Sequence, residues 1–273
     1  MSALAINTDV GEGFGVWGPV DEGDLLDQVT AANVACGFHA GDPDILRRTC
    51  EASVTRGVAI GAQVSYRDLA GFGRRFIEVP KKTLVNELLY QMGALEVFAR
   101  LAGGRVSYLK AHGALYNAAA HHAGHAEAIV EAVTLYDRAL PLLCQPRTVL
   151  WERALAAGCL PLAEAFIDRG YTDEGLLVDR SAPGALVTDP AEAARRALEM
   201  AQAGTVTSVS GRTVRIAPDG GGVAALCVHS DTPGAVAITA AVRTSLAGAG
   251  ITVTTPDDIV REGAAAPRTG ARP

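Results

Sequence analysis

The strongest constraint on the fold of this 273-residue chain is a regular alternation of short β-branched runs with helical segments. The runs predict strands at residues 4–8, 31–35, 58–64, 106–109, 140–144, 160–165 and 224–228, with 251–254 as a further candidate. Helix starts are indicated at Asp42-Pro43, Asp189-Pro190 and Asp231-Thr-Pro233, because aspartate is a favoured N-cap and proline a favoured first helical residue. Strands and helices that alternate in this way predict a parallel sheet.

No linker interrupts the alternation, so we expect one domain over residues 1–255. The predicted fold is a closed or nearly closed (β/α) barrel of seven or eight parallel strands. A doubly wound open sheet is the alternative. Residues 206–216 predict an inserted hairpin that turns at Gly211-Arg212, and the tail at residues 256–273, rich in Ala, Gly, Pro and Arg, predicts disorder.

Composition excludes several classes of partner. The net charge is −6 and no basic block compensates it, which argues against nucleic acid. No uncharged apolar run is long enough to span a membrane, and the N-terminus does not resemble a signal peptide, so we expect a cytoplasmic protein with no membrane partner. Five scattered cysteines without a Cys-x-x-Cys pair indicate reduced thiols.

Polar residues gather just after the predicted strands. They are Asn7, Asp9 and Glu12 after the first strand, Asn33, His39 and Asp42 after the second, Gln63 after the third, Lys110 and His112 after the fourth, Glu164, Asp168 and Arg169 after the sixth, and His229 and Asp231 after the seventh. All strands of a parallel barrel end at one face, so we expect these side chains to surround one cleft. Burying so many ionisable groups is costly, which favours a functional site.

The residue types suggest roles. Asp9, Glu12, His39 and His112 are candidates for proton transfer, and Lys110 and Arg169 suit an anionic group. The remaining polar residues of the cleft are candidates for substrate binding: Asn7, Asn33, Asp42, Gln63, Asp168, His229 and Asp231. Asp9, His39 and His112 could alternatively bind a metal ion.

Some polar residues also have simpler interpretations. Asp42 and Asp231 would serve equally well as helix caps. His121, His122 and His125 lie in a polar stretch, where we expect them to be solvated. The glycine run at residues 220–222 lacks the following Lys-Ser or Lys-Thr of a phosphate-binding loop.

Six segments of the chain resemble the LamB/YcsF family, which comprises A subunits of 5-oxoprolinase. They are Asn7-Thr-Asp-Val-Gly-Glu-Gly-Phe-Gly15, Ala32-Asn-Val-Ala-Cys-Gly-Phe-His-Ala-Gly-Asp42, Gly71-Phe-Gly-Arg-Arg75, Lys110-Ala-His-Gly-Ala-Leu-Tyr-Asn117, Asp168-Arg-Gly-Tyr171 and Val228-His-Ser-Asp-Thr-Pro-Gly-Ala235. The resemblance runs in register from about residue 4 to about residue 250.

The resemblance implies a distorted barrel related to polysaccharide deacetylases. It also implies that the chain acts with 5-oxoprolinase subunits B and C to open the lactam 5-oxoproline to L-glutamate, coupled to hydrolysis of ATP with its Mg²⁺. Because a phosphate loop is missing, we expect a partner to bind ATP, or this chain to bind it in an unusual way. Gln63 departs from the family, which usually has histidine there, and glutamine neither titrates nor binds transition metals well.

Two other functions are compatible with these residues. The first is a metal-dependent deacetylase or amidohydrolase that acts alone. The second is a non-catalytic subunit that regulates its partners. A homo-oligomer is compatible with each of them.

Overall fold

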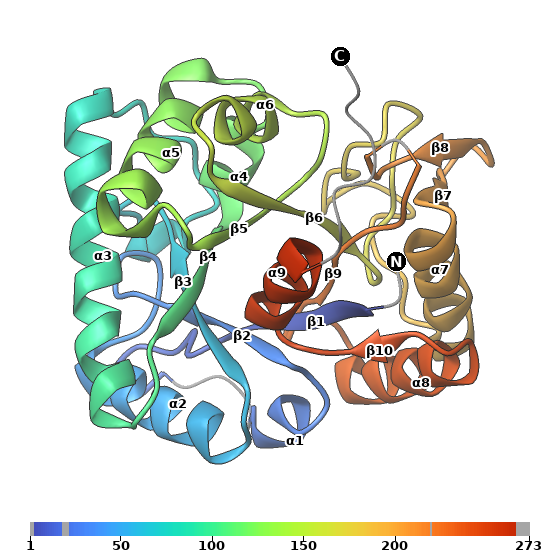
Figure 1. Cartoon of the computed structure of the whole chain (residues 1–273), viewed down its shortest axis with the longest axis horizontal. Coiled ribbons are helices and arrows are strands. Elements are labelled where there is room, and N and C mark those ends of the chain that lie inside the picture. Colours follow the sequence, from blue (N-terminus) through green and yellow to red (C-terminus); the bar gives the residue numbers. More distant parts are fainter. Residues whose placement is uncertain (1–2, 18–21, 219, 266–273) are drawn as a thin grey trace.

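Seven parallel strands close into a barrel in the computed structural model, which describes residues 3–17, 22–218 and 220–265 (Figure 1). The strands follow one another in the order β1, β2, β3, β4, β5, β6 and β9, and β9 pairs with β1 to close the ring. The short β10 pairs with the first residues of β1. The predicted barrel is confirmed, and the β1–β9 pairing excludes the open sheet.

The elements agree with the predicted alternation. The strands are β1 (Ala3–Val10), β2 (Ala31–Ala35), β3 (Ala59–Val64), β4 (Val106–Ala111), β5 (Pro141–Cys144), β6 (Leu160–Phe166), β7 (Thr205–Thr207), β8 (Thr213–Arg215), β9 (Ala225–Val228) and β10 (Thr252–Val253). The helices are α1 (Gly23–Leu26), α2 (Pro43–Thr55), the 3₁₀ helix η1 (Leu69–Gly71), α3 (Lys81–Leu101), α4 (Gly113–Ala119), α5 (Ala123–Asp137), α6 (Val149–Ala156), α7 (Pro190–Gln202), α8 (Ala235–Gly248) and α9 (Pro256–Ala265).

Two of the three predicted helix starts are correct. Asp42 and Asp189 are the N-caps of α2 and α7: the Asp42 carboxylate accepts two backbone N–H groups of the first turn, and that of Asp189 accepts one. The expected start at Asp231 is wrong. Helix α8 begins only at Ala235, after Gly234 in a left-handed conformation, and the Asp231 carboxylate pairs with two arginines instead.

The interior of the barrel has an apolar lower layer and a polar upper layer. The lower layer is formed by Ala5, Ala31, Tyr108, Leu143 and Ala225, with Ala59, Leu162 and Ile259 packed against it. Ile259 belongs to α9, which lies over the middle of the barrel in Figure 1. The expected disorder from Pro256 is therefore wrong for residues 256–265, because this helix closes the N-terminal end of the barrel. Residues 266–273 lie outside the described part of the chain.

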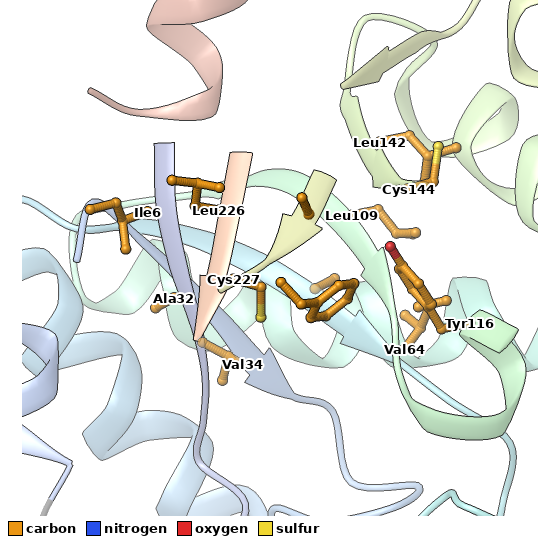
Figure 2. Close-up of a cluster of buried hydrophobic side chains, with 14 of the residues drawn as sticks. Ile6, Ala32, Val34, Val64, Leu109, Tyr116, Leu142, Cys144, Leu226 and Cys227 are labelled. Carbon is orange, nitrogen blue, oxygen red and sulfur yellow. The ribbon is translucent and has the colours of Figure 1, made fainter. Parts of the chain in front are cut away.

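The outer faces of the strands pack against the surrounding helices. Figure 2 shows part of this layer, with labelled apolar side chains from β1, β2, β3, β4, β5 and β9 in one buried cluster. Side chains alternate between the two faces of a strand, so apolar residues at Ile6, Val34 and Leu109 leave the positions between them free to carry polar groups inward. This alternation is what places the site inside the ring.

The remaining sequence predictions concern the insertion and the cysteines. Strands β7 and β8 form the predicted antiparallel hairpin, which lies with α7 between β6 and β9 in the sequence. All five cysteines are free, as expected, and all five are buried. Within the described residues, none of the helices combines the length and apolarity needed to cross a membrane.

Candidate functional site

A cavity of about 400 Å³ opens at the C-terminal ends of the strands. Its wall includes the predicted site residues Asp9, Lys110, His112, Arg169 and His229. Residues from β1, β4 and the segments after β4, β6 and β9 thus meet in one place, as expected for a parallel barrel.

Lys110, near the end of β4, is the cation at the floor of this cavity. Its ammonium group lies 3.0 Å from Asn7 Oδ1, 3.0 Å from Cys227 Sγ and 2.8 Å from Glu164 Oε1. Burial lowers the pKa of Lys110, but its neighbours, Cys227 and Glu164 foremost, raise it well above its ordinary value. Lys110 therefore stays charged, with two hydrogen bonds, to Asn7 and Cys227, and an ion pair with Glu164.

Asp9, on β1, is the anion of the same floor. Its Oδ1 accepts a hydrogen bond from Asn33 at 2.8 Å and lies 3.8 Å from Lys110 Nζ. Burial raises the pKa of the Asp9 carboxyl, but Lys110 and His229 more than offset this and hold it well below its ordinary value. Asp9 is therefore ionised, so it can stabilise positive charge in the cavity but is a weak base.

Two buried asparagines hold Asp9 in place. Asn33 Nδ2 donates to Asn7 Oδ1 at 2.7 Å as well as to Asp9, and the Tyr108 hydroxyl donates to Asn33 Oδ1 at 2.8 Å. Gly61 makes room for this contact, because any side chain there would overlap the Tyr108 ring. Asn7 and Asn33 were predicted to bind substrate, but they are fully buried beneath the floor and position its charged groups instead.

Gln63, near the end of β3, connects three of the predicted catalytic residues. Its Oε1 accepts from His39 Nε2 at 3.2 Å, and its Nε2 donates to Glu12 Oε1 at 3.1 Å and to His112 Nδ1 at 3.0 Å. The rings of His39 and His112 stack with their centroids 3.9 Å apart. Gln63 and His39 are fully buried, so the amide lies behind the cavity wall and holds His112 within it.

Both ring nitrogens of His112 are engaged. Nδ1 accepts from Gln63, and Nε2 donates to the Phe72 carbonyl at 3.0 Å. Burial, followed by the neighbouring His39, lowers the pKa of His112 well below its ordinary value. The imidazole is therefore neutral, with its proton on Nε2.

A metal ion does not fit this group as it stands. Glu12, rather than the predicted Asp9, joins His39 and His112, and one ligand atom from each lies within 4.8 Å of the others. The Gln63 amide already makes its hydrogen bonds to these three residues. An ion would need the same lone pairs and would have to displace that amide, so the donor set is that of a hydrogen-bonded network.

His229, after β9, is held in a different way from His112. Its Nδ1 donates to Asp168 Oδ2 at 2.9 Å, and its backbone N–H donates to the same oxygen at 3.0 Å. Burial raises the pKa of Asp168, but His229 and Thr232 lower it below its ordinary value overall. The ionised carboxylate fixes the proton on Nδ1, which leaves a lone pair on Nε2 of a ring that stacks on Phe166 and lines the cavity.

Three arginines surround the mouth of the cavity. Arg74 and Arg180 each donate to Asp231 Oδ2 at 2.9 Å, so two guanidinium groups share one carboxylate and leave excess positive charge. Arg169 was expected to bind an anion, but its Nε and Nη2 donate to backbone carbonyls within residues 178–185. Arg169 thus fixes the loop that carries Arg180.

The other predicted residues and patterns have structural explanations. Asp42 caps α2 and accepts the Gly15 N–H at 2.7 Å, outside the cavity. In the glycine run, Gly222 packs directly on the Ala201 carbonyl, where a side chain would not fit. That close approach explains the glycine without a bound phosphate.

Sequence reasoning missed some residues of the cavity. Arg74 lies in the Gly71–Arg75 motif, which was a usable signal, whereas Arg180 lies in an irregular loop with no pattern. Phe166 ends β6, where an aromatic side chain is more typical of the core.

The family model described as the LamB/YcsF family matches residues 4–261 of this chain. A protein of Kocuria rhizophila that is named as the A subunit of 5-oxoprolinase is 51% identical over 253 residues, which cover 93% of this chain and 98% of that protein. The crystal structure of a lactam utilization protein from Thermus thermophilus superimposes with a TM-score of 0.86 at 38% identity, covering 93% of this chain and 99% of that one.

A more distant structure, titled T48 deacetylase with substrate, has a TM-score of 0.50 at 16% identity over 96% of this chain and 92% of that one. This likeness concerns the fold alone and agrees with a distorted (β/α) barrel. The family match and the 51% identical relative each cover more than nine tenths of the chain. The chain therefore belongs to the LamB/YcsF family.

Proposed function

We propose that this chain provides the lactam site of an ATP-dependent 5-oxoprolinase, which opens 5-oxoproline to L-glutamate together with subunits B and C. The observation that carries the proposal is one small cavity that combines a positive mouth with the imidazole of His229, which Asp168 holds with its free nitrogen available. The names of the close relatives support the choice of substrate.

The substrate has an anionic end and a weakly reactive end, and the cavity matches both. The carboxylate of 5-oxoproline would bind to Arg74 and Arg180, whose charge exceeds that of their shared partner Asp231. The lactam ring would lie on the apolar wall formed by Phe166 and its neighbours. This orientation places the amide end of the ring toward the floor of the cavity.

Ring opening adds water to the lactam carbonyl carbon, breaks the carbon–nitrogen bond and transfers a proton to the ring nitrogen. ATP bound in the complex would transfer a phosphoryl group to the lactam oxygen, which would make the lactam carbonyl carbon more electrophilic. This group would later leave as inorganic phosphate, so that a second water molecule is consumed. In our proposal, His229 Nε2 takes the proton from the attacking water and returns it to the leaving nitrogen. The carboxylates of Asp168 and Asp9 stabilise the imidazolium ion that forms in between.

A reconstitution assay tests this proposal. We expect glutamate to form from 5-oxoproline only when this chain, subunits B and C and ATP are all present. Turnover by the purified chain alone with an added metal ion would favour the stand-alone amidohydrolase. Full activity of a complex that carries His229→Asn would favour a regulatory role for this chain.

A further inference from the structure

A second group of two histidines and a glutamate lies away from the cavity, where the segment after η1 meets the first turn of α5. One ligand atom from each of Glu78, His122 and His125 lies within 4.8 Å of the others. The three histidines at residues 121–125 were expected to be solvated, but His125 is only 1% exposed. Tyr66 and Phe76, which are distant in sequence, cover its ring.

The start of α5 brings the two imidazoles together. His122 is the N-cap of this helix and His125 follows three residues later, so both lie on the same side of the first turn. Their rings stack with centroids 4.1 Å apart. His122 Nε2 lies 3.7 Å and His125 Nε2 4.0 Å from the carboxylate of Glu78, which is too far for direct hydrogen bonds.

His125 leaves a buried nitrogen without a partner. Its Nδ1 is hydrogen-bonded to the Tyr66 hydroxyl at 2.7 Å, whereas its Nε2 is buried and makes no hydrogen bond of good geometry among the described residues. The backbone carbonyl of Val79 is near enough to the ring to act on the pKa of His125, but burial lowers that pKa overall. A buried atom such as Nε2 costs about 1–3 kcal/mol when nothing compensates it. When the Tyr66 oxygen accepts the Nδ1 proton, Nε2 presents a lone pair toward a carboxylate, and two such groups repel each other unless a cation lies between them.

We propose that Glu78, His122 and His125 bind a divalent transition metal ion, for which Zn²⁺ is the best match. Two imidazoles and one carboxylate with a fourth position for water form a common zinc donor set. Ligand atoms around tetrahedral zinc are about 3.3 Å apart. The contacts of 3.7 Å and 4.0 Å from Glu78 therefore need to shorten by several tenths of an ångström, and the two imidazole nitrogens, which lie within 4.8 Å of each other, need to approach by at most about 1.5 Å. Glu78 has an exposed side chain and can make this shift.

The surroundings of both histidines are compatible with metal binding. Metal-bound imidazoles usually donate their second nitrogen to a hydrogen-bond acceptor, which is the role of the Tyr66 hydroxyl toward His125. His122 Nδ1 accepts the His125 backbone N–H at 3.2 Å, and this N-cap bond, worth about 1 kcal/mol, would be lost when Nδ1 becomes protonated. A metal ion offsets a cost of that size.

The ion would also act on the cavity from a distance. Glu78 ends the segment that begins at Phe72, and the Phe72 carbonyl accepts the hydrogen bond from His112 Nε2. Fastening Glu78 to α5 would restrict the movement of this segment. Metal binding would thus connect the loop that contacts His112 to helix α5. This proposed role does not depend on the identity of the substrate.

Zinc titration of tag-free, chelator-treated protein tests the proposal. We expect one equivalent of Zn²⁺ to bind by calorimetry and to raise the melting temperature. The variants Glu78→Ala and His122→Asn should weaken binding by at least about tenfold and abolish the thermal shift. Both should fold, because Glu78 is exposed and asparagine is a good N-cap.

A neighbouring residue provides the matched control. His121→Ala removes an exposed imidazole beside the cluster and should leave zinc binding unchanged. Co²⁺ should show the visible absorption of a tetrahedral site in the wild type and in His121→Ala, but not in Glu78→Ala. The proposal is overturned if the wild type binds no zinc, or if zinc binding survives in Glu78→Ala and His122→Asn but disappears in Glu12→Gln.

Discussion

His112 and His229 line the same cavity, but they differ in how many of their ring nitrogens are hydrogen-bonded to the protein. Gln63 and the Phe72 carbonyl occupy both nitrogens of His112. Asp168 occupies only Nδ1 of His229, and no hydrogen bond from the described residues reaches its Nε2. Two histidines at strand ends thus differ in the number of ring nitrogens left free, and our proposal assigns proton transfer to His229 on this difference.

The largest expected effect is that of His229→Asn on the rate of the reconstituted complex. Losing the free Nε2 of this ring should reduce kcat by about 10²–10⁴-fold. The melting temperature should change little, because the ring lies at the cavity surface. Steady-state glutamate formation with saturating ATP measures this effect, and a loss below tenfold would remove the functional difference between the two histidines.

The sequence predicts which residues meet in this site, but not which of their polar atoms are free. The period of two along each strand and the common ends of parallel strands were enough to bring Asp9, Lys110, His112 and His229 together. Whether a polar atom is free or already bonded depends on partners far apart in the chain. Gln63, for example, bonds to residues 51 positions earlier and 49 positions later.

The errors in the fold have a related cause. The tail from Pro256 has a composition typical of disorder, yet one apolar side chain, Ile259, closes the lower barrel layer. His125 lies in a polar stretch, yet Tyr66 and Phe76 cover it. A single anchoring contact leaves almost no trace in composition or periodicity.

The second prediction concerns stability and tests how firmly His112 is held. Gln63→Leu removes the amide and leaves polar atoms of Glu12, His39 and His112 buried without partners. Each unsatisfied group costs about 1–3 kcal/mol, so for three groups the free energy of unfolding should fall by at least about 3 kcal/mol. Urea denaturation measures this change.

Gln63→His is the matched control, because histidine can still form hydrogen bonds at this position. It should cost less than about 1.5 kcal/mol. Equal destabilisation by both substitutions would mean that side-chain shape, and not hydrogen bonding, holds His112.

The third prediction concerns pH. The pKa of His112 is lower in the folded protein than its ordinary value of 6.5, so below that pH the unfolded chain binds a proton that the folded chain does not. This contribution to stability is complete above about pH 6.5 and is lost as the pH falls, by at most about 1.4 kcal/mol per unit. The raised pKa of Glu12, which burial causes, acts in the opposite direction.

The contribution of His112 is therefore measured as a difference between proteins. Between about pH 7.5 and about pH 5.5, the wild type should lose more unfolding free energy than His112→Asn. Urea denaturation at both pH values gives this difference. Parallel pH profiles would show that the imidazole of His112 titrates normally in the folded protein.

The smallest expected effect is that of His112→Asn on the reaction itself, and it tests the comparison most directly. Asparagine keeps an amide that can pair with Gln63, and neither nitrogen of the original ring was free to exchange a proton with a ligand. We expect kcat to fall by less than about tenfold, which corresponds to about 1.4 kcal/mol. A loss as large as that of His229→Asn, together with a shifted pH–rate profile, would mean that the Phe72 contact opens during turnover and that His112 is a proton carrier after all.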